Sequence, residues 1–174
     1  VELGRIDMRK TCSTCKFYPG GIQNWCVLKW IKRNCSDIIC SDYVPRRSKH
    51  DLVQAQIASK LYDLGFKVKV EASLPRRVKS VEEFINYVRR NLESREKVRS
   101  QEGYVVVDIL AVKGEPSYRD SESALRRKIL VIEVTYRKNL EEDIRKLENL
   151  NIPAQMIVVP TYKEAKEVKI IPLK

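Results

Sequence analysis

Three acidic residues lie inside segments that otherwise have the composition of buried β-strands. They are Glu71 in VKVEASL, Asp108 in YVVVDILAV and Glu133 in ILVIEVTY. A carboxylate buried among Val, Ile and Leu without a partner is costly, because no water solvates its charge. Three such residues in one small domain are accommodated if they converge on a cation, and Mg2+ and Mn2+ prefer carboxylate oxygens. These segments therefore predict a β-sheet that holds a divalent-metal site.

The hydrophobic pattern after residue 49 predicts alternating helices and strands. Apolar residues recur at helical spacing over 50–66 and again after Ser80, where Glu83 completes a capping-box pattern. A further helix is expected to begin at Asn139. The polar stretch 113–128 is interpreted as a long connection. Strands are expected at about 66–72, 103–112, 129–136, 155–159 and 168–171.

The predicted strands allow the three acids to meet. If the strands at 103–112 and 129–136 pair, Asp108 and Glu133 can lie side by side within reach of one metal ion. Glu71, on the preceding strand, supplies the third corner. A metal held in this way lowers the pKa of a bound water and neutralises charge that develops on a phosphodiester. Phosphodiester hydrolysis is therefore a chemistry that such a site supports.

Four segments, in this order, resemble the PD-(D/E)XK nuclease superfamily. They are the helix that begins at His50, then GFKVKVE at 65–71, VDI at 107–109 and IEVT at 132–135. The resemblance covers residues 50–160 and includes the element order as well as the acids. It implies an α/β fold with a restriction endonuclease-like mixed β-sheet flanked by helices. In the family an Asp and a Glu hold the metal, often with a third acid, and these positions correspond here to Asp108, Glu133 and Glu71.

The chain departs from the family pattern at two positions. Val107 replaces the Pro that usually precedes the Asp. The family also carries a Lys two residues beyond the Glu, which orients the attacking water, and this chain has Thr135 there. A Thr hydroxyl can hydrogen-bond a metal-bound water but brings no positive charge. Lys138 and Lys113, both near strand ends, are the candidates to replace the missing lysine.

His50, the only histidine, begins the first predicted helix, where some relatives carry polar active-site groups. It is therefore a candidate site residue, and an ordinary polar helix start is the alternative. The acids also have an alternative interpretation, in which each is paired with an Arg or Lys in a structural ion pair. Three acids in the order of the family favour the metal site.

All five cysteines precede residue 41, which divides the chain into a Cys-rich metal-binding module, residues 1–45, and a PD-(D/E)XK nuclease-like domain, residues 46–174. So short a module needs a bound metal ion or disulfides to fold, because its apolar core is small. A CxxC pair followed by further cysteines favours tetrahedral Zn2+ over disulfides in a cytoplasmic protein. An iron–sulfur cluster also fits four thiolates, and disulfides fit a hyperthermophilic source. The expected ligands are Cys12, Cys15, Cys26 and Cys40, with Cys35 as the alternate to Cys40.

The net charge of +11 favours a polyanionic partner, which we expect to be DNA, with RNA as the alternative. Basic pairs and triples near the ends of predicted elements suit contacts to phosphates. The connection 113–128 is either a further DNA-contacting loop or disordered. The basic residues expected to bind nucleic acid are Arg76, Arg77, Arg89, Arg90, Arg126, Arg127, Lys128 and Arg137.

No apolar run approaches the ~18 residues that span a bilayer, and the first ten residues lack the apolar core of a signal peptide. We therefore expect a cytoplasmic protein with no membrane partner. The sequence predicts a metal-dependent DNA endonuclease, with Mg2+ or Mn2+ at the acids and Zn2+ in the Cys-rich module. A homodimer is compatible with double-strand cutting. The alternative is a catalytically weak or inactive nuclease-fold protein that binds nucleic acid.

Overall fold

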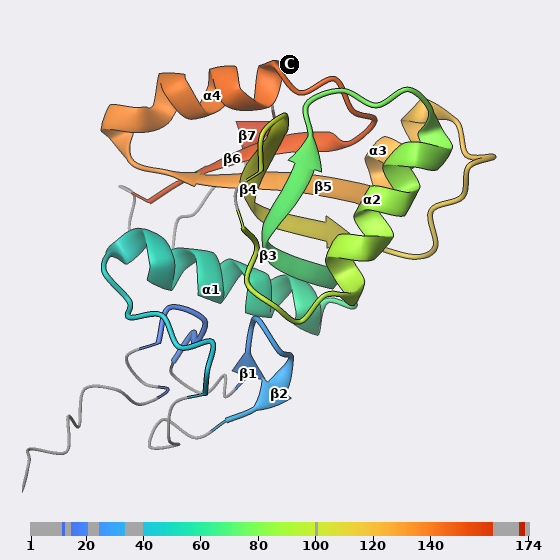
Figure 1. Cartoon of the computed structure of the whole chain (residues 1–174). Helices are drawn as coiled ribbons and strands as arrows, with labels where there is room; N and C mark the ends of the chain where they lie inside the picture. The colour runs from blue at the N-terminus through green and yellow to red at the C-terminus, as the bar shows by residue number, and fades with distance from the viewer. Residues whose placement is uncertain are drawn as a thin grey trace, which may run out of the picture.

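A computed structural model describes residues 12, 15–20, 25–33, 40–99, 101–161 and 171–172. Within this part of the chain, a five-stranded sheet lies between helices, and a short hairpin lies outside α1 (Figure 1). The elements are β1 (Trp25–Cys26), β2 (Ile31–Lys32), α1 (Lys49–Asp63), β3 (Lys67–Pro75), α2 (Val81–Glu93), β4 (Tyr104–Val112), α3 (Glu122–Lys128), β5 (Ile129–Thr135), η2 (Arg137–Asn139), α4 (Leu140–Glu148), β6 (Gln155–Pro160) and β7 (Ile171–Pro172).

The strands of the large sheet follow the order β3-β4-β5-β6-β7. β3, β4 and β5 pair antiparallel, β5 and β6 pair parallel, and β6 pairs antiparallel with β7. A parallel pair needs a crossover connection, which η2 and α4 provide. The expectation of an α/β fold with a mixed sheet flanked by helices is therefore confirmed.

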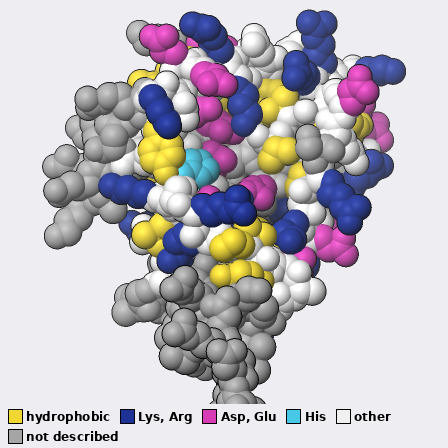
Figure 2. All heavy atoms as spheres, turned by 60° about the vertical axis from the view of Figure 1, so that its left-hand side comes forward, with side chains coloured by type: hydrophobic (Ala, Val, Ile, Leu, Met, Phe, Trp, Pro, Cys, Tyr) yellow, Lys and Arg dark blue, Asp and Glu magenta, His cyan; other side chains and the backbone are white. Residues whose placement is uncertain are grey.

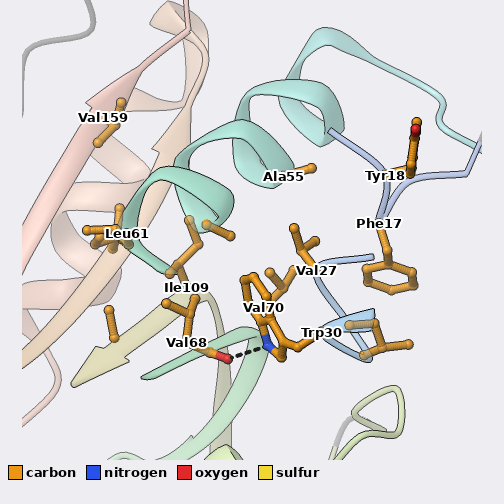
Figure 3. Packing of buried hydrophobic residues seen from close by; sticks show 14 of the residues in the cluster. Phe17, Tyr18, Val27, Trp30, Ala55, Leu61, Val68, Val70, Ile109 and Val159 are labelled. Atoms are coloured by element: carbon orange, nitrogen blue, oxygen red, sulfur yellow. Dashed lines mark hydrogen bonds between the residues drawn. The ribbon is translucent and has the colours of Figure 1, made fainter. Parts of the chain in front are cut away.

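One face of the sheet packs against α1 and the Cys-rich module. Phe17, Val27 and Trp30 of the module share a buried cluster with Ala55 of α1 and Val68 of β3 (Figure 3). The indole Nε1 of Trp30 donates a hydrogen bond of 3.0 Å to the carbonyl of Val68. The described part of the module is therefore fixed to the sheet by apolar packing and by a buried hydrogen bond.

The opposite face packs against α2, α3 and α4 through Phe84, Leu125 and Leu147, which are all fully buried. The sequence interpretation of 113–128 as an unstructured connection is wrong for its last seven residues, which form α3. Ser121 caps this helix, since its hydroxyl accepts the Ala124 amide at 3.2 Å. Only one apolar side chain of α3 enters the core, so the hydrophobic period was too short to detect.

The start of α2 follows the predicted capping pattern with one difference. The Ser80 hydroxyl accepts the Glu83 amide at 3.1 Å, as the pattern requires. The Glu83 carboxylate accepts the Lys79 amide at 2.7 Å, whereas a capping box would use the amide of Ser80. The N-terminus of α2 was therefore correctly located from the sequence.

Lys69 of β3 is a buried lysine that the sequence did not single out. Its ammonium donates to the carbonyls of Ser94, at 3.2 Å, and Glu96, at 2.6 Å, just beyond the end of α2. Burial lowers the pKa of Lys69, and the charge of Arg95 lowers it further. Lys69 therefore ties β3 to the connection between α2 and β4.

Two further sequence expectations concern the last strand and membrane-spanning segments. Of the predicted strand 168–171, residues 168–170 lie outside the described residues, and β7 begins at residue 171. Within the described ranges, every helix is too short or too polar to cross a bilayer.

Leu125→Ala tests whether α3 is part of the core. We expect the free energy of unfolding to fall by about 2–5 kcal/mol, because the side chain is fully buried and its loss leaves a cavity. Urea denaturation followed by circular dichroism measures the change. Leu64→Ala, at a side chain that is 66% exposed, is the matched control and should change stability by less than about 0.5 kcal/mol. Equal stability of the two variants would contradict the packing of α3.

Candidate active site

The hydrogen-bond ladder of the sheet is interrupted on both sides of Asp108. On the β3 side, paired residues flank Glu71 and Asp108 without including them. On the β5 side, the ladder ends at the pair Ile109 and Ile132. The next position along the two antiparallel strands would pair Asp108 with Glu133, and that pair is not formed. The sheet therefore opens at the place where the three predicted acids lie.

Glu71 has a backbone conformation that is unusual for a strand. Its φ is +58°, in the left-handed region that costs a non-glycine residue about 1–3 kcal/mol. Val70 packs on the α1 face of the sheet, whereas Ala72, two positions on, packs on the opposite face. In β4, likewise, Ile109 packs on the α1 face and Val107 packs on the opposite face. Both strands therefore change face at their acidic residue.

At the opening, carboxylates replace backbone groups as hydrogen-bond acceptors. Asp108 Oδ2 accepts the Val134 amide at 2.7 Å, and Glu133 Oε1 accepts the Asp108 amide at 3.2 Å. Gln54 of α1 donates from Nε2 to the Asp108 carbonyl at 3.4 Å. The separation of β4 from β5 is therefore stabilised by the two acidic side chains that the sequence predicted to be neighbours.

His50 of α1 supplies the cation for Asp108. Its Nε2 lies 3.1 Å from Asp108 Oδ2, and its Nδ1 lies 3.6 Å from the Asp51 carboxylate. The His50 amide donates to the Tyr136 hydroxyl at 2.8 Å, which fixes the start of α1 over the end of β5. Burial lowers the pKa of His50, but the hydrogen bond and charge of Asp108 outweigh it and raise the pKa to about 9. Burial alone would raise the pKa of Asp108, and His50 holds it below its usual value.

Lys146 of α4 supplies the cation for Glu133. Its ammonium lies 2.9 Å from Glu133 Oε1, and the Glu133 side chain is 4% exposed. Burial raises the pKa of Glu133 to about 8, and the adjacent charge of Asp108 adds to this effect, while Lys146 opposes it. Asp108 and Glu133 are thus close enough for each to affect the ionisation of the other.

Glu71, the expected third acid, has a different partner. Its carboxylate forms an ion pair with the ammonium of Lys16, from the Cys-rich module, and both side chains are largely buried. The structure therefore places Glu71 opposite Asp108 in the sheet register but directs its charge to the module.

Neither the residue at the position of the family's lysine, Thr135, nor the two expected substitutes for that lysine has a hydrogen bond or ion pair to the acids among those found in the described residues. Thr135 is buried, and its hydroxyl donates to the Tyr136 carbonyl at 3.0 Å. Lys138 is exposed on η2. Lys113 follows the far end of β4, where its ammonium lies 5.4 Å from the centre of the Phe66 ring. The lysine that contacts Glu133 is Lys146, which sequence reasoning missed because no strand period links it to Glu133.

The four preferred cysteines surround one small cavity. Cys12, Cys15, Cys26 and Cys40 line a space of about 30 Å3, and all four are free thiols. Cys35 lies outside the described residues. Among the residues that are described, however, no three His, Cys, Asp or Glu side chains already have the geometry of a metal site, at either the cysteines or the acids. The cysteines therefore converge on one space without forming a closed ligand set.

Five of the eight predicted nucleic-acid contacts lie on α2 and α3. Arg76, Arg77, Arg89, Arg90, Arg126 and Arg127 are exposed, Lys128 pairs with Asp120 at 2.8 Å, and the Arg137 side chain lies outside the described part. In Figure 1, α2 and α3 are at the opposite end of the sheet from the start of α1. Figure 2 shows that the single histidine reaches the surface beside acidic side chains, with other basic side chains around them.

Comparisons with known proteins returned no match: no family model, no curated protein and no solved structure is similar to this chain.

The His50–Asp108 pair predicts a pH-dependent stability of the metal-free protein. A pKa raised from 6.5 to about 9 means that the pair stabilises the fold fully below pH 6.5 and loses this effect as pH rises to about 9. NMR titration of the single imidazole should give a pKa near 9. In Asp108→Asn it should fall to 6.5 or lower, because burial then dominates.

Asp51→Asn is the control. Asp51 is the more distant of the two carboxylates that raise the pKa of His50, so its replacement should lower that pKa less than Asp108→Asn does. Thermal unfolding should show wild-type stability decreasing between pH 6.5 and 9, with a weaker decrease in Asp108→Asn. An imidazole that titrates near 6.5 in the wild type would contradict the contact.

Proposed function

We propose that the chain is a metal-dependent endonuclease that hydrolyses phosphodiester bonds in DNA. The observation that carries the proposal is the opening of the sheet at Asp108, where a half-buried and a buried carboxyl from neighbouring strands lie together. The order of helix, three antiparallel strands, helix and parallel strand accompanies these acids, and agrees with the resemblance to PD-(D/E)XK nucleases noted in the sequence.

The residues at the opening fit a hard divalent cation. Two adjacent carboxyls repel each other when both are ionised, and a shared Mg2+ or Mn2+ would offset that repulsion. Among the described residues, hydrogen bonds to the two carboxyls use Asp108 Oδ2 and Glu133 Oε1. Asp108 and Glu133 would hold the ion, which when bound lowers the pKa of a water and neutralises charge on the phosphodiester.

Lys146 is proposed to do what the lysine of the family does. It reaches the metal-binding Glu133 from α4 instead of from β5, and its ammonium lies 2.9 Å from the carboxylate. An ammonium at this point can donate a hydrogen bond to a water beside Glu133 and orient its lone pair toward a phosphorus atom. His50 can hold Asp108 in place from the other side of the sheet, since it contacts Oδ2.

DNA is the proposed substrate because the chain carries a net charge of +11 and exposes lysines and arginines near the acids. Lys49 is exposed on the first turn of α1, next to His50, and the helix N-terminus there favours a phosphate. The arginines of α2 and α3 lie at the other end of the sheet. A long duplex could reach both ends, whereas a short one at the acids would not.

Cleavage of supercoiled plasmid and branched DNA with Mg2+ or Mn2+ tests the proposal. Asp108→Asn and Glu133→Gln should each reduce the rate by about a hundredfold or more, since each removes a proposed metal ligand. Glu141→Gln, at an exposed carboxylate on α4, is the matched control and should cleave as the wild type does. Structured RNA in the same assay separates the two classes of substrate. Equal cleavage by Asp108→Asn and wild type would rule out the site.

Lys146→Met should reduce the cleavage rate by about ten- to a hundredfold with little change in DNA affinity, because the ammonium acts on the water and not on substrate binding. Lys146→Arg should recover part of the rate. Lys138→Met is the control, at the lysine that is close in sequence to the position of the family's lysine. This variant is expected to retain full activity. If Lys138→Met loses activity and Lys146→Met does not, the assignment of Lys146 is wrong.

A second candidate function is nucleic-acid binding without cleavage. It is favoured by the fact that each acid already has an internal cation, since His50 pairs with Asp108 and Lys146 with Glu133. In this case the network is structural, and Mn2+ would not change the stability of the protein. A rise in melting temperature with Mn2+ that Asp108→Asn abolishes would favour the nuclease instead.

A further inference from the structure

The four thiols around the cavity come from three separate parts of the Cys-rich module. Cys12 and Cys15 share a turn, in which the Cys15 amide donates to the Cys12 carbonyl at 3.0 Å. Cys26 ends β1, and Cys40 begins a turn closed by the Tyr43 amide at 3.1 Å. The cavity therefore lies where these three segments meet, and a ligand there would tie them together.

The surroundings of the cavity offer hydrogen-bond donors to the sulfurs. Burial raises the pKa of the Cys26 thiol, and backbone hydrogen bonds from Lys29 and Leu28 to its sulfur oppose that effect. Lys29 and Arg33 also line the cavity, and the Lys29 ammonium forms an ion pair with Asp42 at 2.7 Å. Four thiolates with nearby amides and cations are suited to a soft divalent metal ion, and tetrahedral Zn2+ is the usual occupant.

The cavity is large enough for a single ion. About 30 Å3 corresponds to about two water-sized spheres, because one such sphere needs about 10–15 Å3. One zinc ion fits this space after the sulfurs close around it.

A residue that lines the cavity, Cys15, is followed in sequence by a lysine whose ion pair lies at the opening of the sheet. Lys16 follows Cys15, and its ammonium pairs with Glu71, the residue with positive φ opposite Asp108. The Lys16 amide donates to the Val44 carbonyl at 2.7 Å, and the Arg46 guanidinium donates to the Cys15 carbonyl at 3.3 Å. The turn that bears two thiols therefore also determines where Lys16 lies.

We propose that Cys12, Cys15, Cys26 and Cys40 bind one zinc ion, and that this ion holds Lys16 in its ion pair with Glu71. Zinc then acts as more than a staple for the module, because it places a fixed positive charge next to the candidate active site. The proposal does not depend on nuclease activity, since both the zinc ion and the ion pair can be measured without a substrate.

Metal content and thiol reactivity of the full chain test the zinc site. Purified protein should contain about one zinc per chain. A thiol reagent should then leave Cys12, Cys15, Cys26 and Cys40 unmodified in the folded protein, and should modify them after chelation and denaturation. Cys26→Ser and Cys40→Ser should lose the zinc, whereas Cys35→Ser should keep it. A brown iron–sulfur chromophore, or zinc retained by Cys26→Ser, would overturn the site.

Zinc affinity tests the coupling to Lys16. If zinc stabilises the ion pair, breaking the pair must weaken zinc binding by the same coupling free energy. Competition with a chromophoric chelator should show affinity lowered about fivefold in Glu71→Gln and in Lys16→Met, with no further loss in the double variant. Glu71 is far from every cysteine in sequence, so a merely local effect is not expected there.

Lys32→Met, at an exposed lysine of β2 in the same module, is the control and should bind zinc as the wild type does. Unchanged zinc affinity in Glu71→Gln would overturn the coupling while leaving the zinc site intact. If the wild-type protein cleaves no nucleic acid but zinc affinity falls as expected in Glu71→Gln and Lys16→Met, the result counts against the nuclease proposal alone.

Discussion

Asp108, which is half-buried, and Glu133, which is buried, lie side by side where β4 and β5 separate, and the groups around them offset the repulsion between the two carboxyls. Each needs a cation or a proton to remain buried. His50 reaches Asp108 from α1 and Lys146 reaches Glu133 from α4, so both helical layers contribute a positive group. The carboxyl pair therefore helps to fix how the helices sit on the sheet, and it is also the basis of the proposed metal site.

The strands on either side of this pair show how the fold accommodates it. Glu71 adopts a positive φ, and both β3 and β4 change the face that they present to the core at their acidic residue. The strain in the backbone is offset by the packing of apolar residues on both faces and by the ion pair of Glu71 with Lys16. An opening in the sheet, a strained backbone and titratable groups thus coincide at one place, as functional sites often require.

Much of this organisation could be predicted from local sequence. The start of α2 was found because Ser80 and Glu83 form a capping signal, and Asp108 and Glu133 were expected to meet because strand alternation and pairing are regular. α3 was missed because only Leu125 enters the core, and one apolar residue is too few to show a helical hydrophobic period. Thr135 was considered because it occupies the position of the family's lysine, and Lys138 and Lys113 because they are close in sequence to strand ends. The contact is made instead by Lys146, from the following helix.

The sequence by itself determined the strands of the large sheet, the helices α1, α2 and α4, the mixed α/β class and the pairing of the two central acids, because these depend on local periods and on neighbouring strands. Only the tertiary structure decided which cations face the acids, since the partners of Asp108 and Glu133 come from helices whose register on the sheet has no local signal. It also decided that Glu71 turns toward Lys16, because a positive φ reverses the face that strand alternation assigns. The four cysteines were grouped by sequence, and packing against the sheet is what brings them around one cavity beside that ion pair.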